Sequence, residues 1–253
     1  MAEEEKGSVC VTGATGFTAS WLIMRLLRHG NSVGATVRSH PPRSLGIWWG
    51  CIFTDFGSRR PLFVSCKRDL SFLTSLPRAH EKLRIFEADL SQPDSFNSII
   101  EGCIGVFHVA HPVIIHDQGY PEDENIKMTM EGTVGILQAC LNSKTVKRVV
   151  YTSSPVTVAF NGEDLDLIDE NTWSDIDFYK SLNLKGTNLY VATKTRTEKA
   201  ALEFAEKHGL DLVTILPTYV VGPFICNVHL PASVHLGLAM IFDKLVLVDL
   251  YIN

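Results

Sequence analysis

The chain has 253 residues, of which 45% are hydrophobic, and its formal net charge at pH 7 is −5. This length can bury a sizeable core and form one large α/β domain, alone or with a small lobe, whereas two unrelated domains are not expected. Because the basic residues are scattered, neither nucleic acid nor an anionic membrane is expected as a partner. A small, uncharged or mildly polar ligand fits better.

The N-terminal residues are acidic and lead directly into a strand-like run, without the basic and apolar regions of a secretion signal. This pattern predicts a cytoplasmic protein. The six cysteines show no metal-type spacing, which predicts reduced, mostly buried thiols and no metal site. No apolar stretch reaches the roughly 20 residues that a membrane helix needs.

Short β-branched runs alternate with longer segments of helical period, which is typical of βαβ units around a parallel sheet. Gly30 and Gly209 stand where helices should end. The pattern predicts a Rossmann-type, doubly wound α/β fold that binds its ligand at the C-terminal strand ends. The predicted strands are residues 8–12, 32–37, 83–88, 105–109, 148–152 and 212–216, and the predicted helices are residues 17–29, 93–101, 122–143 and 187–208.

Residues 9–21 read as a strand, a glycine-rich turn and the start of a helix, which is the order that a pyrophosphate site requires. Gly13 supplies the tight turn, and Gly16 lets the backbone approach the pyrophosphate at the helix N-terminus. Ala19 takes the place of the third glycine, where alanine is tolerated. The alternative is an ordinary strand-to-helix turn. We expect the cofactor to contact Gly13, Thr15, Gly16, Phe17 and Thr18.

The second predicted strand ends without the Asp or Glu that would hold the ribose 2′-hydroxyl of NAD. Arg38 stands there instead, and its guanidinium suits a 2′-phosphate. NADPH is therefore the predicted cofactor. The alternative is that Arg38 is only a solvated residue at a strand end.

Tyr190 and Lys194 are four residues apart on a predicted helix, so their side chains share one face. A phenol is a poor acid or base at neutral pH unless a cation stabilises the phenolate, and Lys194 can supply that cation. Ser154 follows a strand and can hydrogen-bond a substrate carbonyl. Each feature alone arises often by chance. Together they predict hydride transfer to a ketone, with Tyr190 as general acid.

At this point the chain resembles the extended short-chain dehydrogenase/reductases of the plant dihydroflavonol 4-reductase type, a group that includes the vestitone reductases. The resemblance runs from Val9 to about Pro231, apart from one inserted stretch. The segments that carry it include residues 71–77, 88–91, 101–103, 143–148, 173–175 and 217–223.

The resemblance implies that Ser154, Tyr190 and Lys194 are the catalytic residues and that Arg38 binds the 2′-phosphate. It implies an NADPH-dependent oxidoreductase that reduces a flavonoid or isoflavonoid ketone, of the vestitone or dihydroflavonol type, to the alcohol. A cinnamoyl-CoA reductase is less well matched, because residues 188–194 differ from that branch. The further cofactor contacts implied are Asp89 and Leu90 at the adenine, and Val109, Ala110, His111, Pro217 and Val220 near the nicotinamide, besides Tyr190 and Lys194.

The chain departs from the family pattern at several positions. Thr18 and Ala19 replace an Ile-Gly pair, which should be tolerable. His111 replaces a threonine beside the nicotinamide, either as a new polar contact or as a partly buried neutral imidazole. Pro155 follows Ser154 and should bias it toward an extended backbone.

Two departures are larger. Residues 44–66 look like an atypical insertion, and the family continues beyond residue 253. We expect both to come from unspliced or mis-predicted exon boundaries. The predicted domains are a nucleotide-binding domain at residues 1–222 and the start of a truncated substrate lobe at residues 223–253. The alternative function is a catalytically silent relative that only binds NADPH.

Overall fold

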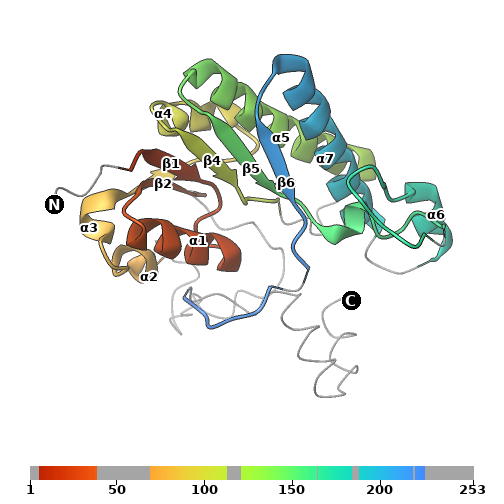
Figure 1. Ribbon diagram of the computed structural model, residues 1–253, viewed down its shortest axis with the longest axis horizontal. Coiled ribbons are helices and arrows are strands. Elements are labelled where there is room, and N and C mark those ends of the chain that lie inside the picture. The colour runs from red at the N-terminus through yellow and green to blue at the C-terminus, as the bar shows by residue number, and fades with distance from the viewer. Residues whose placement is uncertain are drawn as a thin grey trace, which may run out of the picture.

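The computed structural model describes residues 6–38, 69–112, 121–163, 165–183, 188–218 and 220–225. These residues build one parallel, six-stranded sheet in the order β3-β2-β1-β4-β5-β6 (Figure 1). Every predicted strand is present, and none differs from its prediction by more than one residue. The strands are β1 (Ser8–Val11), β2 (Ser32–Val37), β3 (Leu83–Glu87), β4 (Gly105–His108), β5 (Arg148–Thr152) and β6 (Leu212–Ile215).

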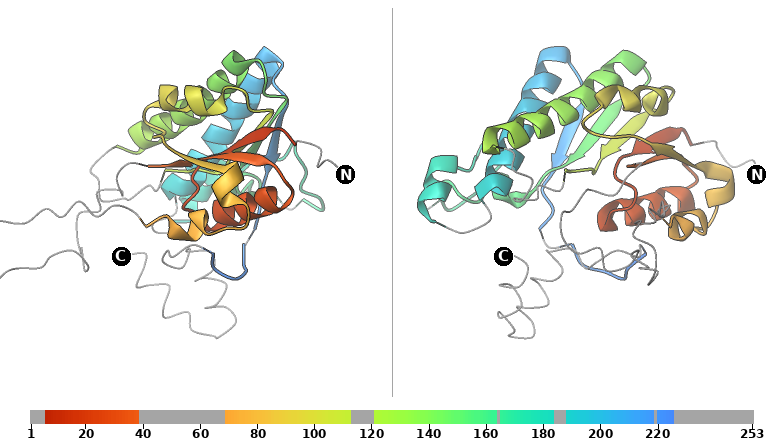
Figure 2. Two further views of the ribbon diagram at one scale, coloured as in Figure 1. Left: turned by 90° about the vertical axis from the view of Figure 1, so that its left-hand side faces the viewer. Right: turned by 180° about the vertical axis from the view of Figure 1, so that it is seen from behind.

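Helices cover both faces of the sheet (Figure 2). On one face lie α1 (Phe17–Arg28), α2 (Ser71–Thr74) and α3 (Ala79–Lys82), and on the other lie α4 (Asn97–Ile100), α5 (Glu122–Ser143) and α7 (Asn188–His208). The short α6 (Ile176–Ser181) lies beside the start of α7. The strand order reverses between β1 and β4, which is where such folds open a ligand crevice. The predicted Rossmann fold is confirmed.

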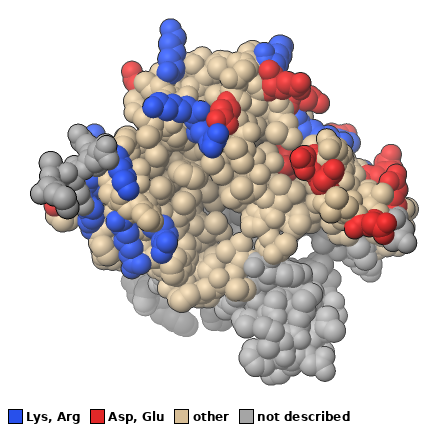
Figure 3. Space-filling model, in the orientation of Figure 1, with Lys and Arg blue, Asp and Glu red and all other residues tan. Residues whose placement is uncertain are grey.

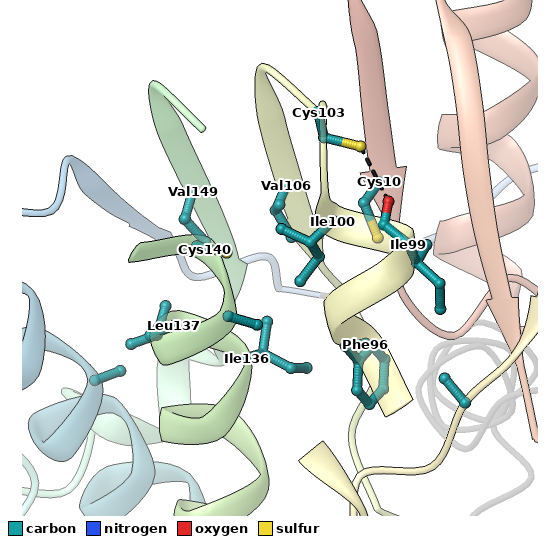
Figure 4. Close-up of a cluster of buried hydrophobic side chains, with 13 residues drawn as sticks. Cys10, Phe96, Ile99, Ile100, Cys103, Val106, Ile136, Leu137, Cys140 and Val149 are labelled. Atoms are coloured by element: carbon teal, nitrogen blue, oxygen red, sulfur yellow. Dashed lines mark hydrogen bonds between the residues drawn. The ribbon is translucent and has the colours of Figure 1, made fainter. Parts of the chain in front are cut away.

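Successive side chains of a strand point to opposite faces of the sheet, which explains why the protein has two hydrophobic cores. Val9 and Val11 of β1 pack with Ile23 and Leu27 of α1, while Cys10 between them packs into the opposite core. Figure 4 shows that second core, where Val106 and Val149 face Ile136 and Leu137 of α5. Continuous β-branched strands buried on both faces are what a parallel sheet requires.

The prediction of one continuous helix at 93–101 is wrong, because this segment divides into the 3₁₀ turn η1 (Pro93–Phe96) and α4. Pro93 opens the segment, and a tight 3₁₀ turn is common at helix starts. Helices α2, α3 and α6 were not predicted, since four to six residues are too short to show a period. Gly30 and Gly209 end α1 and α7 with positive φ, as predicted.

The segment after β3 approaches α5 very closely at two glycines. A Cβ on Gly132 would lie 2.7 Å from the backbone oxygen of Leu90, and a Cβ on Gly135 would lie 2.3 Å from Cβ of Pro93. Any larger side chain on this face would push away the loop that carries Asp89 and Leu90. The close packing of α5 therefore fixes the position of that loop relative to the sheet.

Cys10, Cys103 and Cys140 are buried free thiols, as predicted, and burial raises the pKa of Cys140 to about 12. The Cys103 thiol donates to the carbonyl of Ile99 (Figure 4). Cys51, Cys66, Cys226 and the insertion at 44–66 lie outside the described residues. No helix in the described part of the chain is long and apolar enough to cross a membrane. The domain boundary after residue 222 stays a prediction.

Replacing Gly132 by alanine should lower the free energy of unfolding by about 1–3 kcal/mol, because the new methyl group meets the fixed Leu90 carbonyl. This loss outweighs the gain in helix propensity, which is at most about 1 kcal/mol. Urea denaturation measures it. Gln138→Ala, an exposed site on the same helix, should change stability by less than about 0.5 kcal/mol. Equal effects at the two sites would contradict this account of the packing.

Candidate active site

The candidate site lies at the C-terminal ends of β1, β4 and β5, beside the N-terminus of α1 and one face of α7. Gly13 follows β1 with φ of +73°, a conformation that favours glycine. A Cβ there would lie 3.0 Å from Cα of Ala110 in the turn after β4. The Gly13 and Ala14 N–H groups donate to the Thr36 hydroxyl and carbonyl of β2 at 3.2 and 2.8 Å. The turn is thus tied to both neighbouring strands.

The N-terminus of α1 is available to an anion. Gly16 is its N-cap, no side chain caps the helix, and its first turn holds no acidic residue. Unpaired N–H groups and the helix dipole at such an end attract phosphate. The donor set therefore fits the pyrophosphate of a dinucleotide. Thr15 and Thr18 are partly exposed beside this end, while Ala19 is fully buried against the sheet, as its place in the fingerprint predicted.

Residues after β6 pack on the same helix. The Phe17 ring is buried and lies 5.0 Å from the Phe224 ring. The Trp21 indole donates to the carbonyl of Pro223 at 2.7 Å. Two residues on one face of α1 therefore hold the segment that follows β6 close to the N-terminus of this helix.

A hydrogen-bond network that sequence reasoning missed joins β1 to β4. The Thr12 hydroxyl accepts from the N–H groups of Val109 and Ala110, both at 3.0 Å, and lies 2.9 Å from Nδ1 of His108. With both lone pairs used, Thr12 donates its proton to Nδ1. His108 then donates from Nε2 to the Thr133 hydroxyl of α5 at 3.2 Å.

His108 is a structural residue in this network. Burial, reinforced by the charge of Lys194, lowers its pKa to about 3, so the ring is neutral at physiological pH. Its ring stacks on Tyr151 of β5 at 5.3 Å. The signal in the sequence was a single histidine at the end of an apolar strand, which alone does not distinguish a core residue from a catalytic one.

Asp89 and Leu90 follow β3, and Arg38 follows β2. Ala88 donates to the carbonyl of Val37 at 2.9 Å, so the two strand ends run side by side. The Asp89 carboxylate accepts from the Ser91 N–H and hydroxyl at 2.9 and 2.8 Å, which shapes the turn. Arg38 is partly exposed, as a residue that contacts a ligand phosphate must be.

Two adjacent serines end β5 in different environments. The Ser153 hydroxyl donates to the Glu198 carboxylate of α7 at 2.5 Å, so it is already engaged. Ser154 has the extended backbone that Pro155 predicted, with φ of −158° and ψ of 147°. Within the described part of the chain, its hydroxyl makes a single, long contact of 3.5 Å with the N–H of Val156. Of the pair, Ser154 has the hydroxyl that a substrate can use.

Tyr190 and Lys194 lie on one face of α7, as their spacing predicted, but in contrasting environments. The Tyr190 side chain is 40% exposed, whereas Lys194 is 4% exposed. The Lys194 ammonium donates to the carbonyl of Thr152 at 3.3 Å and lies 5.7 Å from the centre of the Tyr151 ring. Burial lowers the pKa of Lys194 to about 8, although the charge of Glu198 opposes that shift.

His111 stands edge-on to Tyr190, with ring centres 6.0 Å apart. Burial is the main cause that lowers its pKa, so the imidazole is neutral, as one of the two sequence interpretations held. Its Nε2 atom is buried and has no hydrogen-bond partner among the described residues. Pro217 and Val220 are partly buried after β6. Their predicted role beside the nicotinamide stays a prediction.

Comparison with known proteins places these features in a family. The family model described as "NAD dependent epimerase/dehydratase family" matches residues 9–240. Vestitone reductase from Medicago sativa is 47% identical over 243 residues, which cover 95% of this chain and 66% of that protein. A dihydroflavonol 4-reductase from Zea mays is 44% identical, over 94% of this chain and 59% of that protein. The predicted resemblance is confirmed.

The solved structures agree. The crystal structure of vestitone reductase from alfalfa matches with a TM-score of 0.73 and 46% identity, covering 92% of this chain and 63% of that one. The chain therefore spans about three fifths to two thirds of the length of these relatives.

Thr12→Val keeps the shape of the side chain but leaves the Val109 and Ala110 donors and His108 Nδ1 without their shared partner. We expect unfolding free energy to fall by about 2–4 kcal/mol, measured in urea. Thr129→Val is the matched control, because that buried hydroxyl donates to the Asn125 carbonyl of its own helix and has no other partner among the described residues, so the change should cost less than about 1 kcal/mol. Similar losses in both variants would argue against the network.

The lowered pKa of Lys194 makes stability depend on pH. Between its folded pKa of about 8 and its ordinary value of 10.5, the unfolded chain binds more protons, so stability rises with pH across this window. Relative to Lys194→Met, the wild-type chain should gain about 3 kcal/mol between pH 8 and 10.5. Urea denaturation of both chains at each pH tests this, and a constant difference would refute it.

Proposed function

Because the chain belongs to the NAD dependent epimerase/dehydratase family, we propose that it is an NADPH-dependent oxidoreductase that reduces a ketone to an alcohol. The proposed substrate is a flavonoid or isoflavonoid ketone of the vestitone or dihydroflavonol type. The observation that carries the proposal is that Lys194, buried one turn after Tyr190 on α7, donates to the Thr152 carbonyl two residues before Ser154, while the N-terminus of α1 has no side-chain cap.

The residues present suit NADPH. The α1 N-terminus and the Gly13 turn would hold the pyrophosphate, while Thr15, Gly16, Phe17 and Thr18 would surround it. Arg38 would pair with the 2′-phosphate, because it stands at the end of β2 where NAD-binding chains place the acid that holds the ribose 2′-hydroxyl. Asp89 and Leu90 would flank the adenine, and Val109, Ala110, Pro217 and Val220 would line the nicotinamide. When bound, NADPH supplies the hydride that the ketone carbon accepts.

The chain's own residues would handle the proton and the carbonyl oxygen. Ser154 donates a hydrogen bond to that oxygen and stabilises the negative charge that develops on it. Tyr190 gives its phenolic proton to the same oxygen, which completes the alcohol. Lys194, charged below its pKa of about 8, stabilises the phenolate that remains. The phenolate regains a proton before the next turnover.

The substrate class rests on two observations. Both relatives compared above carry names of plant phenolic reductases. In Figure 3, basic residues gather on the α1–α3 side of the molecule, acidic residues on the α6 side and residues of both signs along the top, while the described surface in the lower middle is mostly uncharged. An uncharged polycyclic ketone suits such a surface better than a charged substrate.

NADPH binding tests the cofactor assignment first. Titration calorimetry should show NADPH binding that weakens about 10–100-fold in Arg38→Ala, while NADH binding changes little. Arg84→Ala removes an exposed arginine from neighbouring β3 and should leave both affinities unchanged. If the folded chain binds neither dinucleotide, the proposed function fails.

Turnover tests the reaction. NADPH oxidation with isoflavanones and dihydroflavonols should be detectable, and Tyr190→Phe should lower kcat about 100-fold or more while leaving the Kd for NADPH unchanged. NADPH binding without oxidation of any such ketone would instead identify the chain as a silent NADPH-binding relative. Equal kcat values for the wild-type chain and Tyr190→Phe would remove Tyr190 from the mechanism.

A further inference from the structure

We propose that Glu198 is a positioning residue of this site: it is the buried counter-charge of Lys194, and through Ser153 it fastens the end of β5 to α7. The inference extends the proposed function, because its consequence for turnover depends on Ser154, Tyr190 and Lys194 being the catalytic residues. Neither the fingerprint nor the catalytic triad predicted from the sequence includes Glu198.

Helix geometry places the acid on the catalytic face of α7. Tyr190, Lys194 and Glu198 follow one another at intervals of four residues, so they form one row along the helix. The row runs from the exposed Tyr190 side chain into the protein, since Lys194 and Glu198 are only 4% and 3% exposed. A buried carboxylate is costly unless it is paired and hydrogen-bonded, so Glu198 requires a structural reason.

Contacts with the end of β5 provide that reason. Two consecutive residues there contact α7, and the residue after them is the proposed catalytic serine. The Thr152 carbonyl accepts from Lys194, and the Ser153 hydroxyl donates to Glu198. Ser154 comes next, in an extended backbone conformation. The two contacts therefore form a clamp that sets the position of Ser154 relative to Tyr190.

The groups that face Lys194 make Glu198 its electrostatic partner. On α7 these are Glu198 and Tyr190, on β4 His108, on β5 Tyr151, and after β4 His111. Burial keeps both imidazoles and the Tyr151 phenol uncharged at neutral pH. Among these described groups, a carboxylate at Glu198 is the anion that offsets the cost of burying the ammonium.

Glu198→Gln isolates the charge, because the amide oxygen can still accept from Ser153. We expect the titration midpoint of Lys194 to fall by about one pH unit. The titration of Lys194 is measured by NMR of ¹³Cε-labelled lysine in the chain without cofactor, and the Lys194 signal is assigned by its loss in Lys194→Arg. In the loaded enzyme, the alkaline limb of kcat for ketone reduction should move down by the same amount. Glu206→Gln removes an exposed charge from the same helix and should move the midpoint by about 0.2 units or less.

Ser153→Ala tests the clamp. Without the Ser153 hydroxyl, the end of β5 loses its hydrogen bond to α7, so kcat should fall about tenfold or more through misplacement of Ser154. The Kd for NADPH should not change, and the Lys194 midpoint should move by less than half of the shift seen in Glu198→Gln. An unchanged kcat would show that Ser153 does not position the site.

The outcomes separate this inference from the proposed function. If the wild-type chain reduces no ketone, the reaction assignment fails, but the lysine titration still tests the pairing. Equal Lys194 midpoints in Glu198→Gln and Glu206→Gln would overturn the inference. Should Glu198→Gln not fold, the ¹³Cδ shift of Glu198 in the wild-type chain decides: a protonated carboxyl at pH 7 overturns the counter-charge, and a carboxylate supports it.

Discussion

The Thr12 hydroxyl is the contact on which the site depends. It lies at the point where the strand order reverses, and it uses both of its lone pairs and its proton to join the ends of β1 and β4. The turn that would carry the nicotinamide side and the turn that would carry the pyrophosphate are thereby set by one atom. Since His108 continues the network to α5, the helical layer that contains α5 shares the constraint.

A second constraint is the buried charge on α7. An ammonium held at 4% exposure is unfavourable, yet it bonds the end of β5. Under the proposed function Lys194 would also stabilise the Tyr190 phenolate, so stability would be given up for chemistry at this point, as is common where a pKa is adjusted for proton transfer. The structure limits that loss by surrounding Lys194 with neutral rings and one acid rather than with further cations.

The strands and long helices could be predicted because their signals are local. β-branched runs mark the buried parallel strands, and periodic apolar positions mark α1, α5 and α7. Gly13, Gly16, Tyr190 and Lys194 could be placed because each belongs to a spaced pattern with a chemical reason. Thr12, His108, Ser153 and Glu198 could not, since their partners are 25 to 98 residues away and no local spacing marks them. The short helices could not be predicted for a different reason: each has less than two turns, which is too short to show a periodic pattern.

The two halves of the site are built in different ways, and this difference bears on specificity. On the proposed pyrophosphate side, the N-terminus of α1 and the Gly13 turn present backbone groups, and such a turn tolerates few side-chain changes. One polar atom lies among the residues proposed to surround the nicotinamide: the buried Nε2 of His111 has no hydrogen-bond partner in the described part of the chain, although an unsatisfied polar atom is costly. Under the proposed function, a substrate hydroxyl or carbonyl at that atom would remove the cost, so His111 would favour substrates that carry a polar group beside the reacting ketone. Because relatives with different named substrates are almost equally similar overall, differences in specificity must arise at such positions rather than in the shared core.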